Sequence, residues 1–335
     1  MKAVVTGATG FVGSHLAERL VAEGLEVVCL VRQTSSLVWL EGLDVETRIA
    51  PLEDTEALAK AVADAHAVFH AAGVTRERTP EAYMKANVEN TRRLLDAIER
   101  SCDCLQRFVY VSSQSAAGPT PTPEPLDETA EPHPLPGYGA SKLAAERLVA
   151  GCGGMPWTIV RPPAVYGPRD PNFVTLFRTA QRLGICPILG SADKELTLVH
   201  VADLVEGIWL TATHDTAVGQ TYCIGSGTHT WREVARGLEA ALGRRVRQLA
   251  VPGLLARLIG ELGELTWTLT GKPQIICRRK VRDALQPRWT STWAKAEREL
   301  GYRPKVSLED GLRETARWYA DQGWIRPLGA APNAD

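Results

Sequence analysis

Thr6-Gly7-Ala8-Thr9-Gly10-Phe11-Val12-Gly13 stands between a short apolar run, residues 3–6, and a helical pattern over residues 14–23. Gly7 permits a tight turn, Gly10 lets the backbone approach a pyrophosphate, and Gly13 allows a helix to pack closely on a strand. The helix N-terminus then offers unpaired N–H groups and a partial positive charge to that anion. The stretch predicts a dinucleotide-binding turn. The residues expected at the cofactor are Gly7, Thr9, Gly10, Phe11, Val12 and Gly13.

Outward from this turn, apolar runs alternate with helical patterns through the first half of the chain. The runs that predict strands lie at residues 26–31, 67–70, 108–112 and 157–161. The patterns that predict helices lie at residues 56–63, 87–100 and 141–150. This alternation is typical of βαβ units in a doubly wound parallel sheet. We therefore predict an α/β, Rossmann-like fold with a smaller, mostly helical C-terminal cap that binds substrate.

The predicted Rossmann domain covers residues 1–165 and about 195–225, with a late strand of the same sheet at residues 196–201. The predicted cap covers residues about 166–194 and 226–325, over the carboxyl edge of the sheet, where ligands of such sheets bind. Residues 326–335 are expected to form a frayed tail.

Two further segments carry expectations of their own. Residues 119–136 contain seven prolines and should form an extended loop of the length used for lids. Residues 254–269 are strongly apolar but include Arg257, Glu261 and Glu264. This pattern predicts an amphipathic helix that packs against its own domain.

Charge and cysteine content exclude several classes of function. The 335 residues include 38 basic and 39 acidic side chains, so no chain-wide basic field attracts nucleic acid. We also expect no basic run that holds an anionic membrane, and no membrane span. The seven cysteines include no CxxC pair and no histidine cluster joins them, so we expect no metal site. Free thiols favour a cytoplasmic protein.

Tyr138-Gly139-Ala140-Ser141-Lys142 places a phenol and an ammonium four residues apart, on one face of a helix. A free tyrosine has a pKa of about 10 and is a poor base at neutral pH. A nearby ammonium favours the phenolate and lowers that pKa. The pair therefore predicts an acid/base for an alcohol being oxidised or a carbonyl being reduced.

The glycine turn and the YxxxK spacing together resemble the extended short-chain dehydrogenase/reductase family, the superfamily of nucleotide-sugar epimerases and dehydratases. The resemblance runs from Lys2 to about Trp324. Further matching segments are HAAG at 70–73, NVENT at 87–91, RPPAVYGP at 161–168 and HVADL at 200–204. The resemblance implies that Lys142 binds the nicotinamide ribose, and it implies a homodimer formed through helices of the Rossmann part. It also implies a set of cofactor-lining residues: Ala71, Ala72, Gly73, Asn87, Tyr138, Lys142, Pro162 and Val165.

The family pattern also places a catalytic hydroxyl five residues before a glycine that follows the fifth strand. Gly118 is that glycine, so Ser113 is predicted to hydrogen-bond the substrate oxygen, with Ser112 and Ser115 as supporting or substitute hydroxyls. Sugar dehydratases of the family carry Asp-Glu directly after this hydroxyl. Here Gln114 and Ser115 follow it, so dehydration is not expected.

The end of the second strand bears on the choice of cofactor. An acid there would bind the ribose hydroxyls of NAD, whereas a cation would accept the 2′-phosphate of NADP. Val31 takes the place of the acid and Arg32 follows it, so we expect NADP as the preferred cofactor, with NAD as the alternative. A solvated Arg32 is the other interpretation. Pro51 replaces the family's usual Asp after the third strand, so Leu52 is expected to contact the adenine.

Nucleotide-sugar enzymes of the family hold a diphosphate with two arginines. Leu196 takes the place of one, and Arg282 is the candidate for the other; a missing charged pair costs about 1.5–3 kcal/mol. This favours the reductase or hydroxysteroid-dehydrogenase-like branch, with Ser115 and Arg282 as candidate substrate residues and His200 as a structural residue. The expected function is NAD(P)-dependent hydride transfer between nicotinamide and a secondary alcohol or ketone carbon of a small molecule. The alternatives are a nucleotide-sugar epimerase that retains its NAD, and a non-catalytic NADP-binding protein that serves assembly or regulation.

Overall fold

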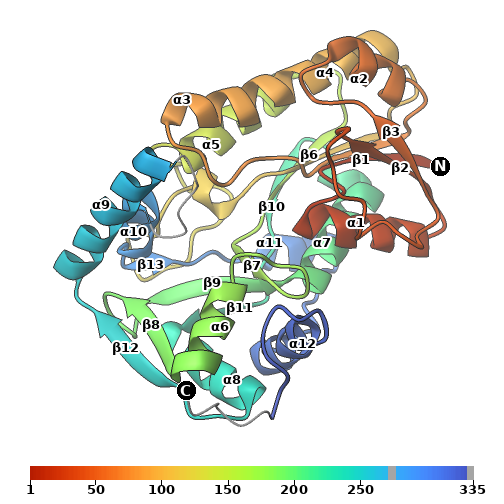
Figure 1. Ribbon diagram of the computed structural model, residues 1–335. Coiled ribbons are helices and arrows are strands. Elements are labelled where there is room, and N and C mark those ends of the chain that lie inside the picture. Colours follow the sequence, from red (N-terminus) through yellow and green to blue (C-terminus); the bar gives the residue numbers. More distant parts are fainter. Residues whose placement is uncertain (271–276, 330–335) are drawn as a thin grey trace.

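The computed structural model describes residues 1–270 and 277–329. Over these residues the main sheet has seven parallel strands in the order β10-β6-β5-β4-β1-β2-β3 (Figure 1). In chain order the strands are β1 (Lys2–Thr6), β2 (Glu26–Val31), β3 (Val45–Ile49), β4 (Ala67–His70), β5 (Arg107–Val111), β6 (Trp157–Arg161) and β10 (Gln220–Cys223). The predicted α/β, Rossmann-like fold is confirmed.

Helices cover both faces of this sheet. The helices concerned are α1 (Phe11–Ala22), α2 (Thr55–Val62), α4 (Asn90–Ser101), α5 (Tyr138–Gly151) and α7 (Val201–Thr213). Leucines of α1 and α7 share one core cluster with Val5, and leucines of α2 and α4 share another with Val4. Consecutive side chains of β1 thus enter opposite layers, as the two-residue period of a strand requires. Burial on both faces explains why the strands are apolar without alternation.

The predicted helix over residues 87–100 is not uniform. A short helix, α3 (Pro80–Tyr83), runs into a π-helical stretch, η1 (Met84–Glu89), before α4 begins. Single π-helical turns are frequent at functional sites, and this one contains Asn87.

The C-terminal part contains small sheets as well as helices. Its strands are β7 (Ala164–Tyr166), β8 (Ile185–Leu189), β9 (Glu195–His200), β11 (Gly227–Thr230), β12 (Arg247–Val251) and β13 (Arg288–Trp289). Its helices are α6 (Val174–Leu183), α8 (Trp231–Leu242), α9 (Gly253–Thr270), α10 (Arg278–Ala284), α11 (Ala294–Leu300) and α12 (Leu308–Asp321). Two 3-10 turns, η2 (Gln114–Ala116) and η3 (Asp215–Ala217), complete the assigned elements.

The placement of residues 196–201 in the main sheet is wrong. This run forms β9, which pairs with β7, β11 and β13 in a separate sheet, and β10 is the edge strand of the main sheet. Both runs are short and apolar, so sequence pattern does not distinguish their partners. Of the predicted tail, residues 326–329 lie outside any helix or strand, and residues 330–335 lie outside the described residues.

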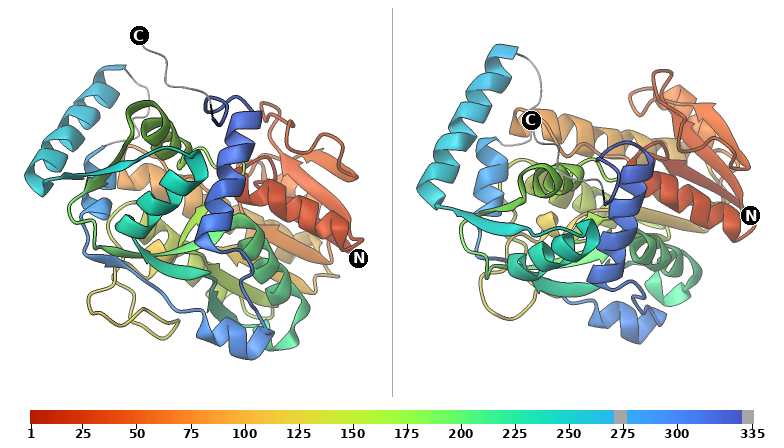
Figure 2. Two further views of the ribbon diagram at one scale, coloured as in Figure 1. Left: turned by 90° about the horizontal axis from the view of Figure 1, so that it is seen from below. Right: turned by 60° about the horizontal axis from the view of Figure 1, so that its bottom comes forward.

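The prediction that residues 254–269 pack against their own domain is also wrong for most of the helix. Among the residues of α9, Ala256, Gly260 and Trp267 are buried. In both views of Figure 2, α9 lies at the outer side of the molecule, with α10 beside it. The helix contacts α10 through a narrow side on which Ala256 and Gly260 are small. Its leucines lie away from this contact and remain exposed. No described helix is long and apolar enough to cross a membrane.

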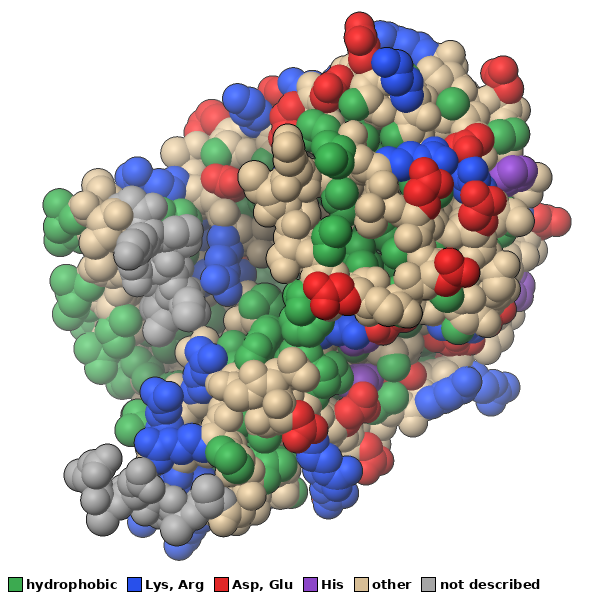
Figure 3. All heavy atoms as spheres, turned by 45° about the vertical axis from the view of Figure 1, so that its right-hand side comes forward, with side chains coloured by type: hydrophobic (Ala, Val, Ile, Leu, Met, Phe, Trp, Pro, Cys, Tyr) green, Lys and Arg blue, Asp and Glu red, His purple; other side chains and the backbone are tan. Residues whose placement is uncertain are grey.

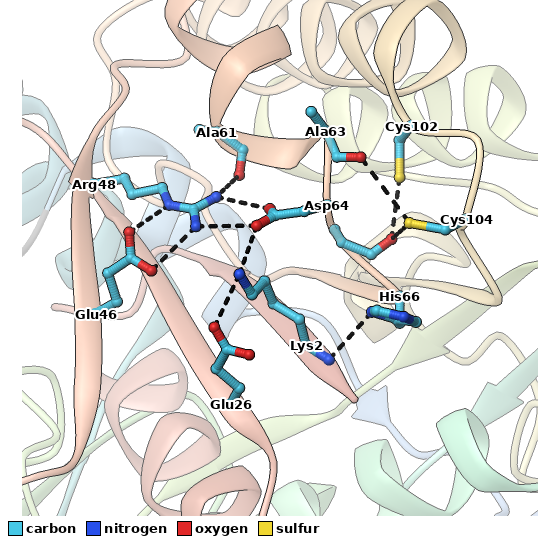
Figure 4. A network of polar contacts seen from close by, with 11 residues as sticks. Lys2, Glu26, Glu46, Arg48, Ala61, Ala63, Asp64, His66, Cys102 and Cys104 are labelled. Carbon is cyan, nitrogen blue, oxygen red and sulfur yellow. Dashed lines mark hydrogen bonds and ion pairs between the residues drawn. The ribbon is translucent and has the colours of Figure 1, made fainter.

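An ion-pair network closes the edge of the main sheet where β1 and β2 begin (Figure 4). Arg48 pairs with Glu46 and Asp64, and Lys2 pairs with Asp64 and Glu26. These contacts hold the pKa of Asp64 well below its usual range. The network stabilises the end of the sheet at which β1 begins. The glycine turn lies at the other end, so the network takes no part in a site at that turn.

All seven cysteines are free. Cys102 and Cys104, at the end of α4, direct their thiols to the carbonyl oxygen of Ala65, at 3.1 and 3.3 Å. In the part of the chain that the structure describes, no group of three or more His, Cys, Asp or Glu side chains is placed to hold a metal ion.

Candidate active site

Helix α5 supplies two of the predicted catalytic residues, Tyr138 at its first position and Lys142 one turn later. The helix comes unusually close to the turn that follows β5. A Cβ on Gly139 would lie 2.4 Å from the carbonyl oxygen of Ser115, so a glycine is required at this contact. This close approach places the phenol of Tyr138 beside the hydroxyl of Ser113.

Ser113 lies two residues after the end of β5 and caps the short helix η2. Its Oγ accepts a hydrogen bond from the N–H of Ser115 at 3.1 Å. Burial raises the pKa of Tyr138 to about 12, and the hydrogen bond with Ser113 opposes this rise. The predicted pair of hydroxyls is therefore brought together, with the phenol holding its proton at neutral pH.

The ammonium of Lys142 contacts strand β5. Its Nζ donates a hydrogen bond to the carbonyl of Val111 at 2.7 Å and lies 4.4 Å from the centroid of the Tyr110 ring. Burial lowers the pKa of Lys142 to about 7. We expected Lys142 to lower the pKa of Tyr138. The pKa of Tyr138 is instead raised, because burial is the largest influence on both groups.

Ser112 does not take part in this cluster. Its Oγ donates to Oε1 of Glu146 at 2.5 Å, and Arg161 binds both oxygens of Glu146, at 2.9 and 2.7 Å. Adjacent residues of a strand point to opposite faces. Ser115, in contrast, lies on the same side as Ser113, so it remains the candidate second hydroxyl.

The glycine turn packs against the end of β4. Gly7 has φ of +73°, and a Cβ there would lie 2.7 Å from the amide nitrogen of Ala72. A Cβ on Gly13 would lie 2.1 Å from the carbonyl oxygen of Gly7. Gly10 is the N-cap residue of α1, whose first turn carries no acidic side chain. Gly7 thus forms the tight turn predicted for it, and the close approach of Gly13 is made to the turn itself. The approach of Gly10 to a pyrophosphate stays a prediction.

Asn87 fixes the loop after β4 next to Lys142. Its side chain accepts from the N–H of Val74 at 2.8 Å and donates to the carbonyl of Val74 at 3.1 Å and to Ser141 at 2.9 Å. A Cβ on Gly73 would lie 3.7 Å from Nζ of Lys142. The loop predicted to line the cofactor is thus held against the lysine predicted to bind its ribose.

His70 is a structural contributor to the site that the sequence analysis did not single out. Its ring nitrogens contact Oγ1 of Thr6 at 2.7 Å and Oγ1 of Thr91 at 2.9 Å. Burial lowers its pKa to about 3, so the ring is neutral. Oγ1 of Thr6 also accepts from the N–H of Ala72 at 3.2 Å. His70 therefore links the strand before the glycine turn to α4. The sequence signal that could have found this contact is the pair of family segments, HAAG and NVENT, which contain His70 and Thr91.

The remaining predicted cofactor residues lie at the same edge of the sheet. Arg32 follows β2 and is exposed; its backbone N–H donates to Ser35 at 3.1 Å, and its guanidinium forms no ion pair with any described residue. Leu52 is half-buried. The carbonyl of Pro162 accepts from Gln114 at 2.7 Å, and Val165 lies in β7.

A cavity of about 220 Å³ opens beside Ser113. Its polar lining consists of Ser113, Gln114, Ser115, Lys194, Glu195, Thr197 and Gln286. Burial lowers the pKa of Lys194. The apolar lining consists of Pro163, Ala164, Leu196, Trp231, Ala284 and Trp289. The cavity thus has a hydroxyl-bearing end and a largely apolar body.

Two candidate residues lie outside this cavity. Nη2 of Arg282 donates to the carbonyl of Pro136 at 2.8 Å, and the side chain lines a separate cavity between α9 and α10. His200 is buried, with its ring 5.3 Å from that of Tyr166, and burial lowers its pKa to about 4. Neither ring nitrogen of His200 has a hydrogen-bond partner among the described residues, so its structural role stays a prediction.

The residues present fit a dinucleotide. A side chain at Gly7 would collide with the backbone of Ala72, and one at Gly13 would collide with the turn itself. The turn leads to a helix N-terminus free of acids. Arg32, Asn87 and Lys142 follow along the same edge, where ligands of parallel sheets bind.

Comparisons with known proteins agree with this geometry. Residues 3–225 match the NAD dependent epimerase/dehydratase family. The chain is 29% identical over 322 residues to a ceramide reductase of Caulobacter vibrioides, covering 96% of this chain and 95% of that protein. It is 30% identical over 328 residues to the 4-hydroxy-2-methyl-3-oxo-4-farnesyl-3,4-dihydroquinoline-1-oxide ketoreductase of Stigmatella aurantiaca, covering 93% and 95%.

A solved structure shows the same fold. The UDP-glucose 4-epimerase of Thermotoga maritima matches with a TM-score of 0.79 at 24% identity, covering 96% of this chain and 99% of that one. The resemblance drawn from the glycine turn and the YxxxK spacing is confirmed. Since the family match spans most of the chain and the fold agrees over nearly all of it, this protein belongs to the NAD-dependent epimerase/dehydratase family, within the extended short-chain dehydrogenases/reductases.

Proposed function

We propose that this protein is an NADP-preferring oxidoreductase that moves a hydride between nicotinamide and a secondary alcohol or ketone carbon of a small, largely apolar molecule. The observation that carries the proposal is the cavity beside Ser113. It combines a hydroxyl-bearing end with an apolar body in which Leu196 stands where a phosphate-binding arginine would be. The ceramide reductase and ketoreductase relatives support the same reaction class.

The proposed mechanism assigns separate tasks to the three clustered residues. The nicotinamide, when bound, supplies or accepts the hydride. Ser113 orients the substrate oxygen by hydrogen bonding, and Tyr138 donates a proton to that oxygen during reduction. The raised pKa of Tyr138, about 12, keeps this proton in place at neutral pH, which favours the direction of carbonyl reduction. Lys142 binds the ribose, and Asn87 holds the loop that positions it.

The bound nucleotide and net turnover test the reaction class. Protein purified without added cofactor is denatured, and the released nucleotide is identified by absorbance and mass. Separately, NADPH consumption is followed with a series of uncharged ketones. We expect easily exchanged NADP and net ketone reduction. A tightly retained NAD without net redox turnover would instead identify a nucleotide-sugar epimerase. NADP binding without turnover of any ketone would identify a non-catalytic protein.

The cofactor preference depends on Arg32. Because its guanidinium is exposed and unpaired among the described residues, it is free to accept a 2′-phosphate. We expect NADPH to bind about 10–150-fold more tightly than NADH, and Arg32→Ala to remove most of this difference. Fluorescence titration of both reduced cofactors measures it, with Arg92→Ala, a change of an exposed arginine on α4, as the matched control. Equal affinities in the unmodified protein would show that Arg32 is a solvated strand end.

Location and assembly remain proposals of the same kind. Seven free thiols support a reducing compartment, and we propose the cytoplasm. A homodimer through helices of the Rossmann part is proposed by analogy with the family, and light scattering of the purified protein tests it.

A further inference from the structure

Helix α9 has an apolar face that no described residue covers. Its six leucines are between 49% and 83% exposed: Leu254, Leu255, Leu258, Leu262, Leu265 and Leu269. From Leu255 onward they recur every three or four residues, which places them on one side of the helix. The buried residues Ala256, Gly260 and Trp267 fall on the opposite side, where the helix meets α10. Hydrophobic side chains gather at the left-hand edge of Figure 3, where this part of the molecule lies.

The segment around this leucine face is strongly basic. Residues 244–288 contain ten basic and three acidic residues, whereas the rest of the chain contains 28 basic and 36 acidic residues. Exposed members of the basic set include Arg245 and Arg247 before the helix and Arg257 within it. Arg278 after the helix is also exposed and pairs with Glu261 of α9. This excess is spread along residues 244–288 and cancels in the net charge of the whole chain, so the sequence pattern led us to expect no basic run that holds an anionic membrane.

We propose that the leucine face of α9 docks on the surface of an anionic lipid bilayer. The leucines enter the boundary between headgroups and acyl chains, and the surrounding arginines contact the anionic headgroups. Charge decides between this occupant and a second copy of the chain. A two-fold dimer through α9 would bring two like-charged basic segments together, because such an interface pairs the same patch on both subunits. An anionic bilayer meets the same patch with opposite charge.

Docking in this orientation places lipid next to the candidate site, a consequence that rests on the proposed function. A cavity of about 320 Å³ lies between α9 and α10. It is lined by Arg257, Glu261, Arg278, Val281, Arg282, Leu285 and Gln286. Gln286 lines both this cavity and the one beside Ser113. The two cavities are therefore neighbours, and a bilayer that contacts α9 lies close to the candidate site.

Vesicle binding by the full chain tests the docking. The protein is sedimented with vesicles of phosphatidylcholine alone, and with vesicles of equal parts phosphatidylcholine and phosphatidylglycerol. We expect binding to the anionic vesicles to be at least about tenfold tighter, and the double change Leu258→Gln/Leu262→Gln to weaken it by at least about tenfold. Leu183→Gln, which changes a leucine that is 67% exposed on α6, should bind like the unmodified protein.

A charge variant provides the second arm. Arg257→Gln should weaken binding to anionic vesicles about fivefold, whereas Arg317→Gln on α12 should not change it. Failure of the unmodified protein to bind anionic vesicles would overturn the proposal. Unchanged binding of the leucine double variant would also overturn it. So would a lipid-free dimer that the leucine double variant converts to a monomer, since a second copy would then cover the face.

Activity on a water-soluble ketone separates this proposal from the proposed function. The leucine double variant should retain that activity, because none of its changes touches the cavity beside Ser113. Tyr138→Phe should bind vesicles normally while losing activity. Vesicle binding without any ketone reduction would therefore overturn the proposed function alone, and ketone reduction without vesicle binding would overturn the docking alone.

Discussion

One face of α5 builds two polar clusters that differ in how their charges are paired. Tyr138, Lys142 and Glu146 succeed one another at intervals of four residues, so they share that face. In the inner cluster, Glu146 binds Arg161 through both oxygens and accepts a hydrogen bond from Ser112. At the outer end, where Lys142 is buried and Tyr138 is half-buried, neither side chain forms an ion pair with a described residue.

Whether the charged groups of a cluster are paired distinguishes polar groups that stabilise the fold from polar groups that are available to bind a ligand. The contact with Glu146 raises the pKa of Arg161 despite burial, so that pair keeps its charges. Burial without an ion pair moves the pKa of Tyr138 up to about 12 and that of Lys142 down to about 7, although each group keeps one hydrogen bond. Strongly shifted groups without partners mark functional sites more often than structural ones. Ser112 and Ser113, adjacent in sequence, fall on opposite sides of this boundary.

Tyr138→Phe gives the largest expected effect on activity. It removes the proton donor and should lower the rate of ketone reduction about 10²–10⁴-fold, with cofactor binding kept. Steady-state kinetics and NADPH titration measure the two effects. The matched control is Tyr83→Phe, whose ring lies 6.1 Å from that of Tyr138 but whose hydroxyl binds the carbonyl of Thr75. Normal turnover by Tyr138→Phe would remove the outer cluster from the mechanism.

Glu146→Gln should have its main effect on stability. Arg161 would remain buried without a counter-charge, which costs about 3–5 kcal/mol in the free energy of unfolding. Urea denaturation measures this loss, and kcat per folded molecule should change little. Glu89→Gln breaks a surface pair with Arg93 and should cost less than about 1 kcal/mol. A large fall in kcat with unchanged stability would reverse the roles assigned to the two clusters.

Lys142→Met should change how stability depends on pH. With a folded pKa of about 7 and an ordinary value of 10.5, the lysine binds more protons in the unfolded state between these pH values. Its presence therefore destabilises the fold fully below pH 7, and the penalty is relieved as pH rises toward 10.5. The variant should be more stable than the unmodified protein by about 2–4 kcal/mol below pH 7, and by progressively less above it.

Denaturation at a series of pH values measures this difference. Lys85→Met, a change of an exposed lysine on η1, should shift stability by less than about 0.5 kcal/mol throughout. A constant difference for Lys142→Met across the range would show that its ammonium is not penalised by burial.

The two neighbouring serines give the smallest effects. Ser112→Ala removes a hydrogen bond to a buried carboxylate and should cost about 1–2 kcal/mol of stability without loss of activity. Ser113→Ala should lower the rate about 10–100-fold with little change in stability. Denaturation and kinetics on both variants check the pair. Equal loss of activity in both would mean that the two hydroxyls do not serve separate clusters.

Local sequence was sufficient for the glycine turn, the strand–helix alternation and the YxxxK pair, because each depends on residues close together in the chain. Gly7 must adopt positive φ, and two residues four positions apart on a helix share a face wherever the helix packs. Ser113 was predicted from its distance to Gly118 within the family pattern. The sheet to which residues 195–200 belong could not be predicted, because the sequence of a short apolar strand does not indicate which strand pairs with it.

The sequence by itself determined the family, the parallel sheet and the residue types at the candidate site. Only the tertiary structure decided how these residues are charged and which of them meet. Burial sets the pKa values of Tyr138 and Lys142, and burial depends on elements far away in the chain. The leucines of α9 show the same principle. Their periodicity predicts an apolar face, but whether that face meets its own domain depends on what lies opposite, and in the described structure nothing does.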